Sequence, residues 1–87
     1  MSVEDRFARR HVVVGPGDRR PYEPAEWDDA LVIVKHGEID VECRAGGRMR
    51  FVAGDMLWFS GLPLRSLCNP GPEPVVLVAI SRRTADR

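Results

Sequence analysis

Short runs of β-forming residues, each closed by a glycine or proline turn, recur through most of this 87-residue chain. The eight glycines and seven prolines fall mainly between these runs, and helical spacing of apolar residues is hard to find anywhere. Six or seven strands at this regular spacing predict an all-β domain, built as a closed barrel or as two packed sheets. The expected strands are residues 11–14, 30–35, 38–44, 48–52, 56–59, 64–68 and 75–80.

Two of these runs also predict where their side chains point. Residues 30–35 read ALVIVK, a continuous apolar run typical of a strand that is buried on both faces. Residues 38–44 alternate, so that Ile39, Val41 and Cys43 share an inward face. The charged side chains between them are expected to lie in water, because successive residues of a strand point to opposite faces.

The length predicts one small domain, with residues 1–9 and 83–87 as flexible tails. A chain of this size buries only about 60 to 65% of the surface that it exposes when unfolded, so its stability as a monomer is marginal. Residues 19–29 carry two prolines, which predicts an irregular or edge segment. We expect a homodimer in which the strand at 11–14 or the strand at 75–80 supplies the contacts.

Charge and hydropathy argue against several classes of protein. Thirteen Lys and Arg balance thirteen Asp and Glu, whereas a nucleic-acid binder needs a clustered basic excess. No apolar run is long enough for a membrane span, and residues 1–10 lack the apolar stretch of a secretory signal. We therefore expect a cytoplasmic protein in which Cys43 and Cys68, which form no Cys-x-x-Cys motif, are packed thiols and not a disulfide or a metal site.

Three motifs carry a resemblance to a known family. They are the strand-turn-strand LVIVKHGEIDVEC around Gly37, the pair Gly54-Asp55 followed by MLWF, and Asn69-Pro70-Gly71 before the last apolar run. Over roughly residues 19 to 81 the chain thereby resembles the cupin family of small jelly-roll barrels. The resemblance implies a single cupin-like barrel of antiparallel strands with little or no helix.

The residues at the family's metal-ligand positions depart from its pattern. Counting back from Gly37, the glutamate position falls on Ala30 or Asp29, and the two histidine positions fall within residues 22–26, which contain no histidine. The histidine position of the second motif falls on Arg65, whose guanidinium has no lone pair to offer a metal. We therefore expect no tightly bound transition metal and no cofactor, while a carboxylate site for a hard cation among Glu23, Glu26, Asp28 and Asp29 stays open.

Three hypotheses for function follow. In the first, which we prefer, the barrel binds a small anionic organic molecule whose charge pairs with Arg65. In the second, the protein is a metal-independent isomerase, epimerase or cyclase, in which a carboxylate acts as base and Arg65 stabilises developing negative charge. In the third, side chains fill the barrel and the protein acts only as an interaction or structural module.

The residues proposed for the site lie mainly in two segments, one rich in acids and one following the second motif. The expected ligand-binding residues are Tyr22, Trp27, Trp58, Arg65 and Asn69. The candidates for acid-base or charge-stabilising roles are Glu26, Asp29 and Arg65, with Glu23 and Asp28 as further acids nearby. Structural alternatives remain open: Arg65 pairs with an acid or lies outside the barrel, and Trp27 caps the core.

Overall fold

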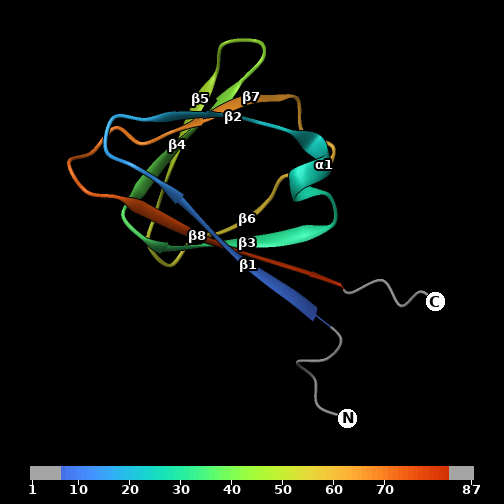
Figure 1. Ribbon diagram of the computed structural model, residues 1–87. Helices are drawn as coiled ribbons and strands as arrows, with labels where there is room; N and C mark the ends of the chain where they lie inside the picture. The colour runs from blue at the N-terminus through green and yellow to red at the C-terminus, as the bar shows by residue number, and fades with distance from the viewer. Residues whose placement is uncertain (1–6, 83–87) are drawn as a thin grey trace.

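The computed structural model describes residues 7–82, which form eight strands and one short helix, α1 (Pro24–Trp27) (Figure 1). The strands are β1 (Phe7–Val14), β2 (Arg19–Pro21), β3 (Ala30–His36), β4 (Glu38–Cys43), β5 (Arg48–Val52), β6 (Met56–Trp58), β7 (Leu64–Cys68) and β8 (Val75–Arg82). They build two antiparallel four-stranded sheets. Sheet 1 has the order β1-β8-β3-β6 and sheet 2 the order β2-β7-β4-β5. The prediction of an all-β jelly roll with little helix is confirmed.

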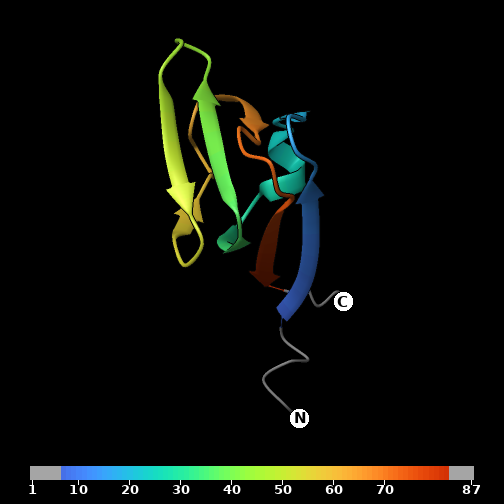
Figure 2. The same cartoon turned by 90° about the vertical axis from the view of Figure 1, so that its left-hand side faces the viewer.

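The core lies between the two sheets and is filled by aliphatic and aromatic side chains. Figure 2 shows the β4–β5 hairpin on one side of the molecule and β1 with β8 on the other. The largest fully buried side chains between them are Trp27, Phe59, Ile39, Leu64, Leu67, Leu77, Val32, Val34, Val41 and Val75. Side chains occupy most of the space between the sheets, as expected for a barrel of this size.

Strand β3 corrects one expectation about burial. Ala30, Val32 and Val34 are buried against sheet 2, but Leu31 and Ile33 are partly exposed. The continuous apolar run was predicted to be buried on both faces. This prediction is wrong, because the face of β3 that carries Leu31 and Ile33 is only partly covered. The reason is that β3 belongs to a two-layer structure, in which each sheet has only one covered face.

Strand β4 corrects a second expectation. Asp40 points away from the core, as its place in the alternating run predicts, yet only 2% of it is exposed. Arg50 of β5 lies directly opposite Asp40 in the register and covers it. The prediction that this face of β4 is solvated is therefore wrong at Asp40.

The segments before β3 are more regular than expected. Residues 7–9, which were assigned to a flexible tail, belong to β1 and pair with the end of β8, while residues 1–6 and 83–87 lie outside the described residues. Within residues 19–29, Pro21 ends β2 and Pro24 begins α1. Proline is tolerated in a first helical turn because its missing N–H has no intrahelical partner there.

Two further observations concern the described residues as a whole. None of their helices is long and apolar enough to cross a membrane. Cys43 and Cys68 are both free thiols, each half-buried.

Candidate functional site

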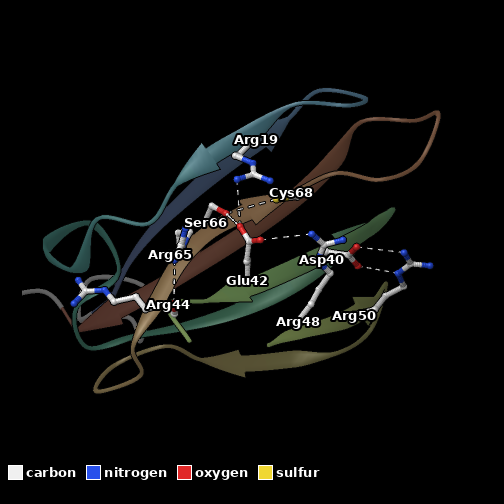
Figure 3. Close-up of polar contacts among 9 residues, drawn as sticks. All are labelled: Arg19, Asp40, Glu42, Arg44, Arg48, Arg50, Arg65, Ser66 and Cys68. Atoms are coloured by element: carbon white, nitrogen blue, oxygen red, sulfur yellow. Dashed lines mark hydrogen bonds and ion pairs between the residues drawn. The ribbon is translucent and has the colours of Figure 1, made fainter. Parts of the chain in front are cut away.

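Arg65 lies on the outside of the barrel, on the face shown in Figure 3. The register between β4 and β7 shifts at this point, so that the two neighbours of Arg65 pair with adjacent residues of β4 and Arg65 is the extra residue of a bulge. Its side chain is exposed, and Nη2 donates a hydrogen bond to the carbonyl oxygen of Arg44 at 3.0 Å. The premise of its expected ligand-binding role, a position inside the barrel, is wrong, and the alternative of an outside position is confirmed.

Trp27 and Tyr22 both pack against the ring of Phe59 at one end of the core. Trp27, delivered by α1, is completely buried, and its ring meets that of Phe59 edge to face at 5.4 Å. Tyr22 meets Phe59 in the same way at 5.9 Å, and the guanidinium of Arg10 lies 5.1 Å from the centre of the Trp27 ring. Trp27 therefore caps the core, as the structural alternative predicted.

Glu26 forms ion pairs with its side chain, and Asp29 forms a hydrogen bond through its backbone. Glu26 pairs with Arg20 and, at 3.5 Å, with Arg10. Asp29 is exposed at a positive φ of 59°, and its backbone N–H donates to Ser60 Oγ at 3.0 Å. Burial, and after it the charge of nearby Asp28, raises the pKa of Tyr22, which makes its phenol a poorer proton donor.

Asn69 is committed to the loop that follows it. Its Nδ2 donates to the carbonyl oxygens of Val14, at 3.0 Å, and of Glu73, at 2.6 Å. Its Oδ1 accepts a hydrogen bond from the N–H of Gly71 at 2.9 Å, a turn geometry that asparagine favours. The amide thus ties the loop before β8 to the end of β1, and Asn69 also lines a cavity of about 420 Å³.

Polar side chains gather on the outward face of sheet 2 (Figure 3). Glu42 is their centre: its Oε1 accepts a hydrogen bond from Ser66 Oγ at 2.8 Å and pairs with Arg19 at 3.3 Å. Its Oε2 lies 3.5 Å from Arg48, and Ser66 also contacts Cys68 Sγ at 3.6 Å. We call these residues the polar cluster: Arg19, Asp40, Glu42, Arg48, Arg50, Ser66 and Cys68.

The charges of the polar cluster are arranged as in a structural ion-pair network and not as in an acid-base catalyst. The hydrogen bond from Arg50 lowers the pKa of Asp40, and the hydrogen bond from Ser66 lowers the pKa of Glu42. Both carboxylates are therefore ionised near neutral pH, hold no proton to donate and are weak bases. Sequence reasoning did not find this cluster, because its cations come from β2 and β5, and only the register brings them to β4.

A cleft lined by apolar residues opens between β5 and β6, and we call it the apolar cleft. Strands β5 and β6 are the outermost strands of the two sheets, and the cleft between them has a volume of about 340 Å³. All of its lining residues are apolar: Val41, Met49, Phe51, Met56, Leu57, Trp58, Phe59 and Leu62. Trp58, which was expected to bind a ligand, lies here with 51% of its surface exposed.

The other seven residues of the cleft were missed as a site. The alternation of residues 48–52 did predict that Met49 and Phe51 share a face of that strand. It could not show that β5 and β6 end their sheets on the same side of the molecule, which is what brings them to one opening.

The metal-ligand positions implied by the resemblance do not fit a metal. Ala30 is buried and apolar, Asp29 is exposed at a turn, and Arg65 is outside the barrel. Among residues 7–82, no three His, Cys, Asp or Glu side chains are grouped where they could hold a metal ion. The residues at these positions therefore do not fit the metal site that the resemblance implies.

Several solved structures of other proteins share the fold of this chain. No family model and no curated protein matches this chain. A Cupin 2 conserved barrel domain protein from Salinispora arenicola is 22% identical, with a TM-score of 0.68 over 91% of this chain. The cupin domain of Cnp3 from Schizosaccharomyces pombe is 22% identical, with a TM-score of 0.70 over 97%.

A third solved structure carries a name that refers to an activity. It is described as a sugar phosphate isomerase from a cupin superfamily, from Silicibacter pomeroyi, and is 24% identical with a TM-score of 0.65 over 91% of this chain. The chain spans 65%, 58% and 52% of the lengths of these three proteins. Their shared architecture and the two antiparallel sheets described above show that this chain has the cupin fold.

Proposed function

We propose that this cupin-fold domain binds a small, uncharged and largely apolar molecule in the apolar cleft. The observation that carries the proposal is the lining of the cleft, which is apolar throughout its volume of about 340 Å³. Ligand sites typically have volumes of roughly 300 to 1,000 Å³ and mainly apolar walls. The cleft falls at the lower end of this range, which suits a molecule of one or two rings.

The residues of the cleft indicate the chemistry of the ligand. An ionised group placed here would lose its water and gain no partner from the side chains that line the cleft, which is costly. Phe51 and Trp58 offer aromatic faces, and the flexible thioethers of Met49 and Met56 adapt to ligands of different shape. Burying about 150 Å² of apolar ligand surface contributes about 4 kcal/mol before the entropy lost on association is subtracted, so we expect weak binding of a molecule this small.

This proposal changes the ligand class that was expected from the sequence. An anionic ligand was expected because Arg65 was placed inside the barrel, and Arg65 lies outside. The enzyme hypothesis needs a carboxylate base near the ligand, and neither Glu26 nor Asp29 is among the residues that line the cleft. We therefore propose binding and assign no reaction.

A matched pair of ligands tests the proposal. Benzyl alcohol and benzoate have the same ring, and only benzoate is charged at neutral pH. We expect benzyl alcohol to shift the backbone amide resonances of Met49, Phe51 and Trp58 saturably in NMR spectra, and benzoate to leave them unchanged. Shifts with benzoate alone, or no saturable shift at these residues at millimolar benzyl alcohol, would overturn the proposal.

A matched pair of variants provides the control. Leu62 in the cleft and Val52 on the outward face of sheet 2 are each 44% exposed. Leu62→Asp should weaken the binding of benzyl alcohol at least tenfold, because it places a charge at the cleft. Val52→Asp should leave the affinity unchanged, and equal weakening by both variants would contradict binding at the cleft.

A further inference from the structure

Strand β5 ends sheet 2 and pairs on one side only, with β4. The N–H of Cys43 donates to the carbonyl oxygen of Gly47 at 2.7 Å, so these two residues are a hydrogen-bonded pair of the antiparallel ladder. Such pairs alternate with pairs that exchange no hydrogen bonds. Arg48 and Arg50 belong to the second kind, and their backbone N–H and C=O groups therefore point away from β4.

The far end of this edge is closed by the chain itself. The N–H of Val52 donates to Asp55 Oδ2, and the carbonyl oxygen of Val52 accepts from the N–H of Asp55, both at 2.9 Å. The backbone groups of Arg48 and Arg50 that point away from β4 have no such partner among residues 7–82. We call residues 48–51 the open edge.

We propose that the open edge binds an extended peptide segment of a partner protein, in which acidic side chains alternate with apolar ones. A strand that adds to a sheet edge gains main-chain hydrogen bonds, and its side chains decide which sequence is accepted. These side chains would lie alternately on the two faces of sheet 2. One row would lie beside Arg48 and Arg50 on the outward face, and the other beside Met49 and Phe51 at the apolar cleft.

The two arginines indicate that the outward row of the peptide is acidic. Their side chains are 55% and 56% exposed, and each contacts a carboxylate of β4: Arg48 with Glu42 at 3.5 Å and Arg50 with Asp40 at 2.8 Å. A guanidinium has five N–H donors, so donors remain for a carboxylate on the side away from β4. Alternate residues of a strand are about 7 Å apart, which gives acids at alternate positions of the peptide the same spacing as the arginines.

Strand β4 shows the sequence pattern that fits against β5. Residues 38–43 read EIDVEC, and the register places Asp40 opposite Arg50 and Glu42 opposite Arg48. The same pattern suits a strand on the other side of β5. The open edge of a second copy does not, because it would place arginine opposite arginine, and like charges directly opposite each other destabilise a strand pair.

This inference goes beyond the proposed function and rests on it in one respect, since the apolar row of the peptide would enter the apolar cleft. The two proposals fail separately. Binding of benzyl alcohol without binding of the peptide would overturn only the peptide proposal. Binding of the peptide without binding of benzyl alcohol would overturn only the small-molecule proposal.

NMR titration with the peptide acetyl-EIDVE-amide, the sequence of residues 38–42, tests the open edge. The backbone amide resonances of Arg48 and Arg50 should shift saturably, and their N–H groups should exchange more slowly with solvent. The peptide acetyl-EEDIV-amide has the same composition without the alternation, and acetyl-QINVQ-amide has the alternation without the charge. Both should bind at least tenfold more weakly. No saturable shift with millimolar acetyl-EIDVE-amide would overturn the proposal.

Variants at one position separate the backbone of the open edge from its charge. Arg48→Gln removes the charge and keeps the N–H, and it should weaken the acidic peptide about threefold. Arg48→Pro also removes the N–H that points away from β4, so it should weaken the peptide at least tenfold while keeping the hydrogen bonds to β4. Arg65→Gln is the control, because Arg65 is an exposed arginine of the same face but lies on β7.

Circular dichroism shows whether each variant is folded. If Arg48→Pro does not fold, the comparison of Arg48→Gln with Arg65→Gln and the solvent exchange of the wild-type amides still test the proposal. A folded Arg48→Pro that binds as tightly as Arg48→Gln would contradict binding through the open edge. Equal weakening by Arg48→Gln and Arg65→Gln would show a general attraction of the acidic peptide to this face and would also overturn the proposal.

Discussion

Asp40 and Arg50 face each other across β4 and β5, and Asp40 Oδ1 accepts a hydrogen bond from Arg50 Nε at 2.8 Å. The second carboxylate oxygen of Asp40 accepts from Arg50 Nη2 at 3.3 Å. The carboxylate side chain is 3% exposed, whereas that of the arginine is 56% exposed. The pair thus holds one buried charge by means of a partner that remains in water.

Removing the Asp40 carboxylate should destabilise the protein and change its response to acid. A hydrogen bond to a charged group contributes about 1.5 to 3 kcal/mol, so Asp40→Asn should lose about 2 kcal/mol at pH 7. The pKa of Asp40 is lowered in the folded state, so its contribution is present above the unfolded pKa of about 3.9. It is lost as pH falls from there through the folded pKa.

Urea unfolding at pH 7 and at pH 3 measures this difference. The wild-type chain should lose more free energy of unfolding between the two pH values than Asp40→Asn does. Glu38→Gln is the control, because Glu38 is half exposed and pairs with Arg50 only at 3.9 Å. Such surface pairs contribute about 0 to 1 kcal/mol, and an Asp40→Asn variant with an unchanged acid response would contradict the prediction.

Gly37 joins β3 to β4 at a position that only glycine fits. Its φ is 85°, and an added Cβ would lie 2.9 Å from the carbonyl oxygen of Pro74. Gly37→Ala should therefore lower the free energy of unfolding by about 2 kcal/mol or more, from backbone strain and steric contact together. Thermal and urea unfolding measure the loss.

Gly47→Ala is the matched control for Gly37. Nothing lies within 4 Å of a Cβ added at Gly47, and no positive φ restricts it. This substitution should be neutral or stabilise by up to about 1 kcal/mol, because alanine reduces the entropy of the unfolded chain. A loss of unfolding free energy in Gly37→Ala that is no larger than the change in Gly47→Ala would contradict the prediction.

The two tryptophans should report separately on the core and the cleft. Trp27 is fully buried and Trp58 is half exposed, so acrylamide should quench the fluorescence of Trp58 alone. Trp58→Phe should remove the accessible component and leave the inaccessible one. Benzyl alcohol should protect Trp58 from quenching, and an accessible component that persists in Trp58→Phe would place Trp27 elsewhere than in the core.

Arg65→Gln tests the hypothesis that Arg65 binds an anionic ligand inside the barrel. The side chain of Arg65 is exposed and makes one hydrogen bond, to Arg44. Its loss should cost less than about 1 kcal/mol and leave the affinity for benzyl alcohol unchanged. Benzoate binding that Arg65→Gln abolishes would return this residue to the ligand site. NMR titration of the wild-type chain and of Arg65→Gln with each ligand measures these affinities.

The sequence predicted the strands well because the signals for them are local. Gly37 and Gly54 both adopt the positive φ that their turns require, and Asn69 begins a turn through its own side chain. The β4–β5 hairpin follows the Ala45-Gly46-Gly47 signal. Each of these features depends on residues close together in the chain.

The site was harder to predict because its geometry depends on register and on distant strands. A bulge of one residue moves Arg65 from the inside to the outside, since side chains alternate between faces. Asp40 is buried by Arg50, ten residues away along the chain. The cleft needs β5 and β6 at the edges of two different sheets, which no local pattern specifies.

The helix α1 determines how often the end of this barrel is open. A ligand can enter there only after Trp27 leaves its place against Phe59. Moving the fully buried Trp27 ring out of the core would expose it to water and leave a cavity behind, so α1 closes this end of the barrel.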